Sequence, residues 1–364
     1  RSIMFIKYIS LQNYRNYKNL SLDFDPKTNI FYGDNAQGKT NILEAVYVSG
    51  TTRSHKSAKD RELIYFGEEE AHICTIMERN GLDHKIDLHL RKNKTKGIAI
   101  DGIPIRKASE LFGLVHFVFF SPEDLCIIKN GPSERRRFID SELCQLDKVY
   151  LHELANYNKI VLQRNKLLKE IHFRQDYREV LEILDLQLIK YGREIIRRRT
   201  LFVQELNEII QEIHQKLSGG QEQIVLGYEA NVQEDQLEQK LQDHMDRDIH
   251  LKTTTAGPHR DDLSFLVNDI DIRKFGSQGQ QRTAALSLKL SEIELVKRRV
   301  HDTPVLLLDD VLSELDSSRQ NYLLNSIENI QTLITCTGLD EFINHRFSVN
   351  KIYKVCGGNV TVKN

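Results

Sequence analysis

A glycine-rich segment followed by lysine and threonine contains the residues of this chain best suited to phosphate chemistry. It reads Gly33-Asp34-Asn35-Ala36-Gln37-Gly38-Lys39-Thr40 and fits the pattern G-x-x-x-x-G-K-[ST]. Such a loop points several backbone N–H groups at a polyphosphate, and the helix that follows adds partial positive charge there. We expect Lys39 to reach the β- and γ-phosphates of ATP and Thr40 to bind Mg²⁺. Asn41 completes the predicted nucleotide-binding stretch.

The flanking residues favour this interpretation. Residues 29–32 read as a short buried strand and residues 41–46 as a helix, which is the order that a phosphate-binding loop requires. The alternative is an ordinary glycine loop before a helix, with a solvated lysine. The strand and helix in the right places make that alternative the weaker one.

Two acids follow a second apolar run. Val305 to Leu308 are all apolar, and Asp309 and Asp310 come directly after them. Carboxylates at the C-terminal end of a parallel strand emerge where α/β folds bind ligands. We expect Asp309 to bind Mg²⁺ and Asp310 to be the base that orients the attacking water. The segment 313–316 that follows is either a D-loop or the N-cap of the next helix.

Two segments compete for the signature motif of an ABC-type ATPase, which contacts the γ-phosphate of ATP bound to a partner. Residues 217–221 read LSGGQ, but a helical pattern precedes them and a strand-like one follows, so the two glycines predict a helix C-cap. Residues 277–282 read SQGQQR and precede a helical pattern, which would aim a helix N-terminus at a phosphate. We therefore assign Ser277, Gly279 and Gln280 to the nucleotide site.

Composition restricts the other possibilities. The chain has 364 residues, of which 40% are hydrophobic and 28% charged, with a formal net charge of −1, so no global basic field attracts DNA. Its five cysteines are scattered without a C-x-x-C pair, which favours a reducing cytoplasm over a zinc site or disulfide framework. We expect no membrane span and no signal peptide. Met4 is the expected natural start, with residues 1–3 as a foreign extension.

Periodicity predicts an α/β protein. Alternating apolar and polar residues predict strands at 5–11, 20–24, 71–77, 85–90 and 98–100. Continuous apolar runs predict strands buried on both faces at 115–120, 305–308 and 333–335, which with 30–32 would form a parallel nucleotide-binding core.

The middle of the chain, from about Pro122 to Leu217, has helical periodicity instead. One apolar series with a/d spacing runs from Leu154 to Ile171, and a second runs from Leu181 to Ile213, with a polar break at 174–176. Two such helices form an antiparallel hairpin, either packed in the usual way or protruding as a short coiled-coil arm.

We therefore expect three parts. Residues 1–120 would form the N-terminal part of an ATPase head with the Walker A loop. Residues 121–250 would form an inserted, mainly helical domain. Residues 251–364 would complete the head with the signature motif, Walker B and D-loop.

Beyond these motifs, the chain resembles the RecF family of bacterial DNA replication and repair ATPases. The matching blocks are the loop 33–41 and the segments Ser121–Leu125, Gly131–Phe138, Gly257–Leu263, Gly276–Arg282 and Asp309–Asp316. They span almost the whole length in the family's order. Two departures from general ABC ATPases are Thr337, where a switch histidine is usual, and Asp310, where glutamate is usual.

The resemblance implies an ABC-type head similar to those of SMC and Rad50 proteins, with a short helical insertion. It implies an ATP-dependent homodimer in which Ser277 of each chain faces the ATP of the other. It also implies weak, DNA-stimulated ATP hydrolysis, and binding of duplex or gapped DNA at junctions of single and double strands. RecO and RecR would be partners in loading RecA during DNA repair, replication restart, homologous recombination and the SOS response.

Several basic clusters are candidate DNA contacts. Arg135, Arg136 and Arg137 are the preferred set, with residues 91–96 at a predicted hairpin tip and 197–199 on the predicted hairpin helix as others. Consecutive helical residues are about 100° apart around the axis, so no triplet can form one basic face. A solvated charged surface is the alternative for each cluster. Arg53 and His55 are further candidates for approaching the nucleotide.

Three other functions remain as alternatives. The first is an ABC-type motor subunit of another DNA-repair or transport assembly, although a transporter would not need so long a helical insertion. A nuclease with an ATPase head is disfavoured because no further Asp/Glu/His cluster suggests a two-metal site. A binding scaffold with a vestigial ATPase is the third.

Overall fold

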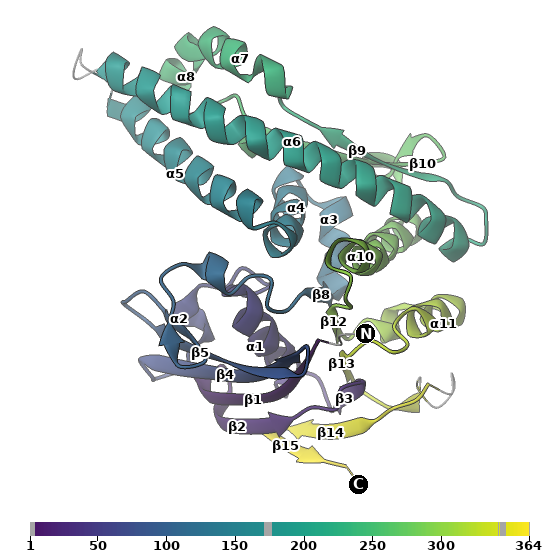
Figure 1. Cartoon of the computed structure of the whole chain (residues 1–364). Coiled ribbons are helices and arrows are strands. Elements are labelled where there is room, and N and C mark those ends of the chain that lie inside the picture. The colour runs from purple at the N-terminus through teal and green to yellow at the C-terminus, as the bar shows by residue number, and fades with distance from the viewer. Residues whose placement is uncertain (1–3, 171–176, 341, 343–346, 364) are drawn as a thin grey trace. The chain divides into compact units, whose positions relative to one another are not determined.

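The computed structural model describes residues 4–170, 177–340, 342 and 347–363 (Figure 1). Residues 1–3 and the predicted turn at 174–176, with Ile171, lie outside the described residues. Contacts divide the chain into two units, which we describe separately. Unit 1 consists of residues 1–124 and 292–364, and unit 2 of residues 125–291.

An antiparallel sheet of unit 1 is built mainly from the N-terminal region. Its order is β2-β1-β4-β5-β6-β7. The strands are β1 (Phe5–Tyr14), β2 (Tyr17–Asp23), β4 (Glu70–Arg79), β5 (Leu82–Arg91), β6 (Gly97–Ile100) and β7 (Ile103–Pro104). On β4, every second residue from Ala71 to Met77 is buried, because one face covers the core while the other faces outward. The strands expected from alternation are confirmed.

The second sheet of unit 1 has the order β15-β14-β3-β13-β12-β8. Its strands are β3 (Thr28–Tyr32), β8 (Phe117–Phe120), β12 (Val305–Asp309), β13 (Thr332–Cys336), β14 (Lys351–Cys356) and β15 (Asn359–Val362). The five from β14 to β8 are parallel, as the continuous apolar runs predict, and all four residues of β8 are buried. The antiparallel edge strand β15 and its partner β14 were not predicted.

Helix α1 (Lys39–Thr51) links the two sheets, because it contacts β4 and β5 on one side and β8, β12 and β13 on the other (Figure 1). Gly50 allows its close approach to β8, since a Cβ atom at this position would lie 2.3 Å from the ring of Phe117. The shorter helices of unit 1 are α2 (Asp60–Leu63) and α11 (Ser317–Ser326), with 3-10 turns at Ala108–Glu110, Pro122–Asp124 and Leu312–Glu314.

Unit 2 is mainly helical. Its helices are α3 (Leu125–Lys129), α4 (Pro132–Leu146), α5 (Lys148–Glu170), α6 (Tyr177–Leu217), α7 (Leu237–Asp243), α8 (Met245–Leu251), α9 (Ile272–Phe275) and the first part of α10 (Gln278–Val300). It also has 3-10 turns at Glu234–Gln236 and Pro258–Arg260 and a small sheet, β11-β10-β9, formed by Ile270–Asp271, Asp262–Val267 and Ile224–Glu229.

Helices α5 and α6 form the expected hairpin, and α6 is also covered by α7 and β9 (Figure 1). Buried residues such as Tyr157, Leu168, Leu188 and Phe202 follow the predicted series. The hairpin is therefore packed within unit 2 along much of α6. None of the helices in the described part of the chain is both long and apolar enough to cross a membrane.

The division into contact units falls at residues 124 and 291, whereas the expected inserted domain ends at 250. The later boundary has a physical cause. Strand β10 pairs along its whole length with β9, and α9 packs against β10, so residues 262–275 belong to unit 2. Ser277 and the first half of α10 lie in the same unit.

Candidate nucleotide site

The predicted phosphate loop connects β3 to α1, and close packing requires its two glycines. Gly38 has a φ of 103°, and a Cβ atom there would lie 2.7 Å from the Tyr17 hydroxyl. At Gly33, a Cβ atom would lie 2.2 Å from the carbonyl oxygen of Val355. The loop is thus held between β2 and β14, and its backbone takes a conformation that other residues rarely adopt.

Lys39 opens helix α1 and is buried, with 7% of its surface exposed. Its ammonium group donates to the carbonyl oxygen of Gly33, at the start of the loop, and to that of Cys336, 2.9 Å away at the end of β13. Both acceptors are uncharged. Lys39 is therefore held beside the loop with its positive charge available to an anion.

Thr40 and Asp309 lie together at the carboxyl edge of the parallel sheet. The Thr40 hydroxyl donates to Oδ1 of Asp309 over 2.8 Å, and the Thr335 hydroxyl donates to the same oxygen over 2.7 Å. Adjacency of β3, β13 and β12 brings together residues that are up to 295 positions apart (335 − 40). A carboxylate and a hydroxyl oxygen are hard ligands of the kind that Mg²⁺ prefers, so these residues fit the ion.

Asp310 follows the end of β12 in a left-handed conformation, with a φ of 48°. Its backbone N–H donates to the carbonyl and the hydroxyl oxygens of Thr335, at 3.2 and 3.0 Å, and its Oδ1 accepts from the Ser313 hydroxyl at 3.2 Å. These contacts hold the backbone of Asp310 in a conformation that residues other than glycine rarely adopt. Asp316, the last residue of the expected D-loop, caps α11 by accepting from the N–H of Arg319.

Sequence reasoning missed the residues that support the loop. Gln37 accepts a hydrogen bond from the N–H of Gly357 over 2.6 Å, and the Tyr17 hydroxyl donates to the carbonyl of Gly38. Asn16 accepts from the side chain of Asn41 and donates to the carbonyl of Gln37. Thr335 was also missed, although its place at the end of a buried strand was a usable signal.

A buried glutamate on α1 anchors the helix below the loop. Glu44 accepts from Tyr14, from Arg15 in a bidentate pair, and from Ser54. Burial alone would raise the pKa of Glu44, but the hydrogen bonds from Arg15 and Ser54 outweigh it and lower this pKa. The carboxylate therefore stays ionised and ties α1 to β1.

The two signature candidates differ as expected. Helix α6 ends at Leu217, and Gly219 and Gly220 follow with φ of 62° and 79°; the N–H of Gly220 donates to Gln215. This is a helix C-cap. Ser277 instead precedes α10, where its hydroxyl accepts from the N–H of Gln280 while the Gln280 side chain accepts from the N–H of Ser277. That reciprocal capping box places Ser277 at a helix N-terminus. Gly279 lies in the first turn of α10.

The three arginines of α4 have different environments. Arg135 is buried, pairs with Asp262 and donates to the carbonyls of Ile127, Ile128 and Asn130. A guanidinium used in this way cannot reach DNA, so the expectation for Arg135 is wrong. Arg137 is exposed and pairs with Glu134.

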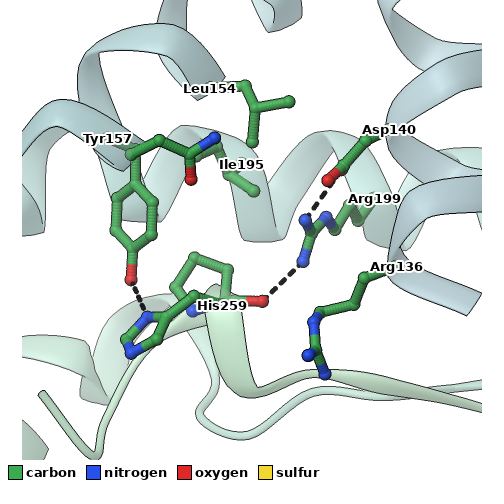
Figure 2. Close-up of a pocket in the computed structure, with 9 residues that line it drawn as sticks. Arg136, Asp140, Leu154, Tyr157, Ile195, Arg199 and His259 are labelled. Carbon is green, nitrogen blue, oxygen red and sulfur yellow. Dashed lines mark hydrogen bonds and ion pairs between the residues drawn. The ribbon is translucent and has the colours of Figure 1, made fainter. Parts of the chain in front are cut away.

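Arg136 lines a cavity of about 100 Å³ in unit 2, and its guanidinium donates to the carbonyl of Asp261. Figure 2 shows this cavity between the hairpin helices and the turn 258–260, with Arg199 bonded to Asp140 and to the carbonyl of Pro258. Across it, the Tyr157 hydroxyl lies 2.7 Å from Nδ1 of His259.

The other candidates lie in different environments. Arg199, at the end of the second arginine triplet, is 2% exposed and pairs with Asp140 and Asp261. The expected hairpin tip 91–96 connects β5 to β6. His55 stacks on Phe119 with ring centroids 3.8 Å apart. Arg53 is exposed and Thr337 lies just after β13.

Comparisons with known proteins show which families this chain is similar to. The model of the RecF/RecN/SMC N-terminal domain family matches residues 5–359. A protein of Agathobacter rectalis named DNA replication and repair protein RecF is 62% identical over 359 residues, which cover 99% of both chains. Its namesake from Lachnoclostridium phytofermentans is 61% identical over 357 residues, covering 98% of this chain and 99% of the other.

Solved structures show the same similarity. A structure of the recombination mediator protein RecF with ATP, in the RecFOR pathway, superimposes with a TM-score of 0.92 at 35% identity, covering 100% of this chain and 98% of that one. An Smc head domain from Pyrococcus furiosus gives a TM-score of 0.58 at 16% identity, covering 99% and 96%. The expected SMC-like ABC ATPase head fold is therefore confirmed.

Proposed function

The chain belongs to the RecF family of DNA replication and repair proteins, and on that premise we propose that it is an ATP-controlled, DNA-binding recombination mediator. The main support is a hydrogen-bonded group at one edge of the parallel sheet, beside Lys39. It consists of Thr40, Asp309 and Thr335. This arrangement carries the proposal because it joins three separate segments into one site for a magnesium-bound triphosphate.

The residues of unit 1 would divide the work of binding and hydrolysis. The backbone of 33–38 would surround the β-phosphate, and Lys39 would move from its two carbonyl acceptors to phosphate oxygens. Thr40 and Asp309 would hold Mg²⁺, which supplies charge neutralisation at the phosphates. Asp310 would orient the attacking water, and the short reach of aspartate is consistent with weak hydrolysis.

Ser277 would act in a dimer. It lies at the N-terminus of α10, where backbone N–H groups and the helix dipole favour an anion. With Gly279 and Gln280 it would contact the γ-phosphate held by a second copy of the chain. ATP would thereby hold two copies together on duplex DNA or at a junction of single and double strands, and hydrolysis would release them. We further propose RecO and RecR as partners in loading RecA.

Two serine variants test the dimer. Ser277→Arg should block dimerisation sterically, while Ser218→Arg, in the LSGGQ segment at the end of α6, should not. Molar mass would be measured by light scattering after gel filtration in Mg-ATP, and ATP affinity of each variant separately. We expect a dimer for the wild type and Ser218→Arg and a monomer for Ser277→Arg. ATP affinity, measured at a protein concentration too low for dimerisation, should be equal in all three.

Either of two results would contradict the proposal. A wild-type chain that binds Mg-ATP yet stays monomeric would remove the dimer, and dimerisation lost in Ser218→Arg but kept in Ser277→Arg would reverse the motif assignment. Duplex DNA binding, followed by fluorescence anisotropy with and without a non-hydrolysable ATP analogue, tests the DNA step. Binding that ignores the nucleotide would show that ATP does not control it.

A further inference from the structure

Two histidines and a glutamate meet on the outward face of the antiparallel sheet of unit 1. His72 on β4 is directly opposite His89 on β5, and Glu70 is two residues before His72, hence on the same face. The imidazole rings stack with centroids 4.2 Å apart and an interplanar angle of 20°. Nε2 of His89 lies 2.8 Å from Oε2 of Glu70.

This cluster has the geometry of a metal site. One ligand atom from each of the three residues lies within 4.8 Å of the other two. A tetrahedral ion with ligands about 2.0–2.1 Å away needs them about 3.3 Å apart. The Glu70 and His89 side chains are 53% and 33% exposed, so rotation about side-chain bonds can close the difference without moving the strands.

The ligand chemistry selects the class of ion. Two imidazole nitrogens and one carboxylate oxygen suit zinc and its neighbours, whereas magnesium and calcium prefer oxygen ligands alone. We propose that Glu70, His72 and His89 form a binding site for a divalent transition-metal ion of the zinc class, which bridges β4 and β5. A fourth position would be left to water.

Neighbouring groups are consistent with three protein ligands. Cys74 is two residues after His72 on β4, but it lies outside the Glu70–His72–His89 cluster. Arg91 is opposite Glu70, but its guanidinium donates to the carbonyl of Thr95.

Zinc titration of the full-length, untagged chain tests the site. The protein would be stripped with a chelator and kept in excess Mg²⁺, so that Asp309 does not take up the added metal, and binding would be followed by calorimetry. We expect one Zn²⁺ per chain. Removing a metal ligand's hydrogen-bond partner costs about 10- to 100-fold in affinity, so removing a ligand in His72→Gln or His89→Gln should cost at least about 100-fold.

His84→Gln is the matched control. His84 is also on β5 and also contacts a carboxylate, Asp101, with 3.0 Å between Nδ1 and Oδ2, but it lies outside the His72–His89–Glu70 cluster. This variant should bind Zn²⁺ as the wild type does. Zinc should raise the melting temperature of the wild type and His84→Gln, and leave His72→Gln and His89→Gln unchanged.

Absence of stoichiometric binding by the wild type, or equal binding by all four chains, would overturn the proposal. A second readout follows metal binding on the wild type and uses the variants only to assign its histidine signals. Paramagnetic Co²⁺ should broaden the imidazole NMR signals of two histidines and spare the rest, and these two signals should be those missing from His72→Gln and His89→Gln. Broadening of other histidines, or of none, would also overturn it.

Discussion

Buried cations in the two units have different partners. In unit 1, Lys39 is buried against two carbonyl oxygens, those of Gly33 and Cys336. In unit 2, Arg164 is fully buried against the carboxylates of Asp185 and Asp248. Both are basic residues in or near helical segments, and the sequence alone does not distinguish them.

The difference lies in charge compensation. Burying an ionised group is costly unless a partner of opposite charge is present, and a paired charge offers little attraction to a further anion. Arg164 and Arg199 are compensated and so hold unit 2 together. Lys39 has only uncharged carbonyl acceptors and lies beside a loop of backbone N–H groups, so its positive charge can attract an anion. A buried cation whose partners are uncharged is therefore a better sign of a binding site than basic composition.

The largest effect is expected from Arg164→Ala. Removing this side chain leaves Asp185 and Asp248 buried without their cation and also removes a hydrogen bond to Thr254. Breaking a buried pair in this way costs about 3–5 kcal/mol in the free energy of unfolding. Urea unfolding followed by circular dichroism would measure it, with a transition assigned to unit 2.

Arg197→Ala on the same hairpin is the control, because Arg197 is 52% exposed in its pair with Glu194. It should change stability by less than about 1 kcal/mol. Equal losses in the two variants would remove the distinction between buried, paired cations and surface ones.

A conservative change at Lys39 tests the other side of the comparison. Lys39→Arg keeps the positive charge but replaces a compact ammonium with a planar guanidinium in a tightly packed position. ATP hydrolysis should fall about 10²- to 10³-fold, as when one transition-state donor is lost, and ATP affinity should fall less. Phosphate release and nucleotide binding by calorimetry measure the two.

Lys56→Arg, at an exposed position of unit 1, should leave both quantities unchanged. If Lys39→Arg hydrolyses ATP at the wild-type rate, hydrolysis requires only a positive charge at this position and not the compact ammonium group of lysine. A loss of ATP affinity with kcat unchanged would instead mean that Lys39 contributes equally to binding the ground state and the transition state.

The backbone setting of each predicted nucleotide-site motif was readable from the sequence because its signals are local. The loop 33–40, the apolar run before Asp309 and the helix after Ser277 are each readable within about ten residues. Local context also separated Ser277 from the LSGGQ letters at the end of α6. The prediction placed LSGGQ at the end of a helix and Ser277 at the start of one, and the bounds of α6 and α10 agree with it.

Long-range partners were not predictable. Arg135 was expected to face DNA, but it pairs with Asp262, 127 residues further along the chain. Thr335 bridges Asp309 and Asp310 only because β13 lies beside β12 in the sheet order. Gln37 meets Gly357 across 320 residues. Each contact depends on the order and register of the strands, and these cannot be inferred from a single sequence.

His259 gives the sharpest small test, because unit 2 buries this imidazole in its neutral form. Its Nε2 donates to the carbonyl of Thr254, and its Nδ1 accepts from Tyr157, so no nitrogen is left for a second proton. Burial, with Arg260 and Arg136 nearby, lowers the pKa of His259 from 6.5 to about 4. Between these two values the unfolded chain binds a proton that the folded chain does not, so stability falls as pH falls.

From about pH 7.5 to about pH 5.5, this group should remove about 1 kcal/mol from the free energy of unfolding. Urea unfolding of His259→Gln at both pH values isolates the contribution, because the other titrating groups remain; its loss should be smaller than that of the wild type by the same amount. Identical losses would show that the imidazole is charged when folded, and that unit 2 tolerates an uncompensated cation after all.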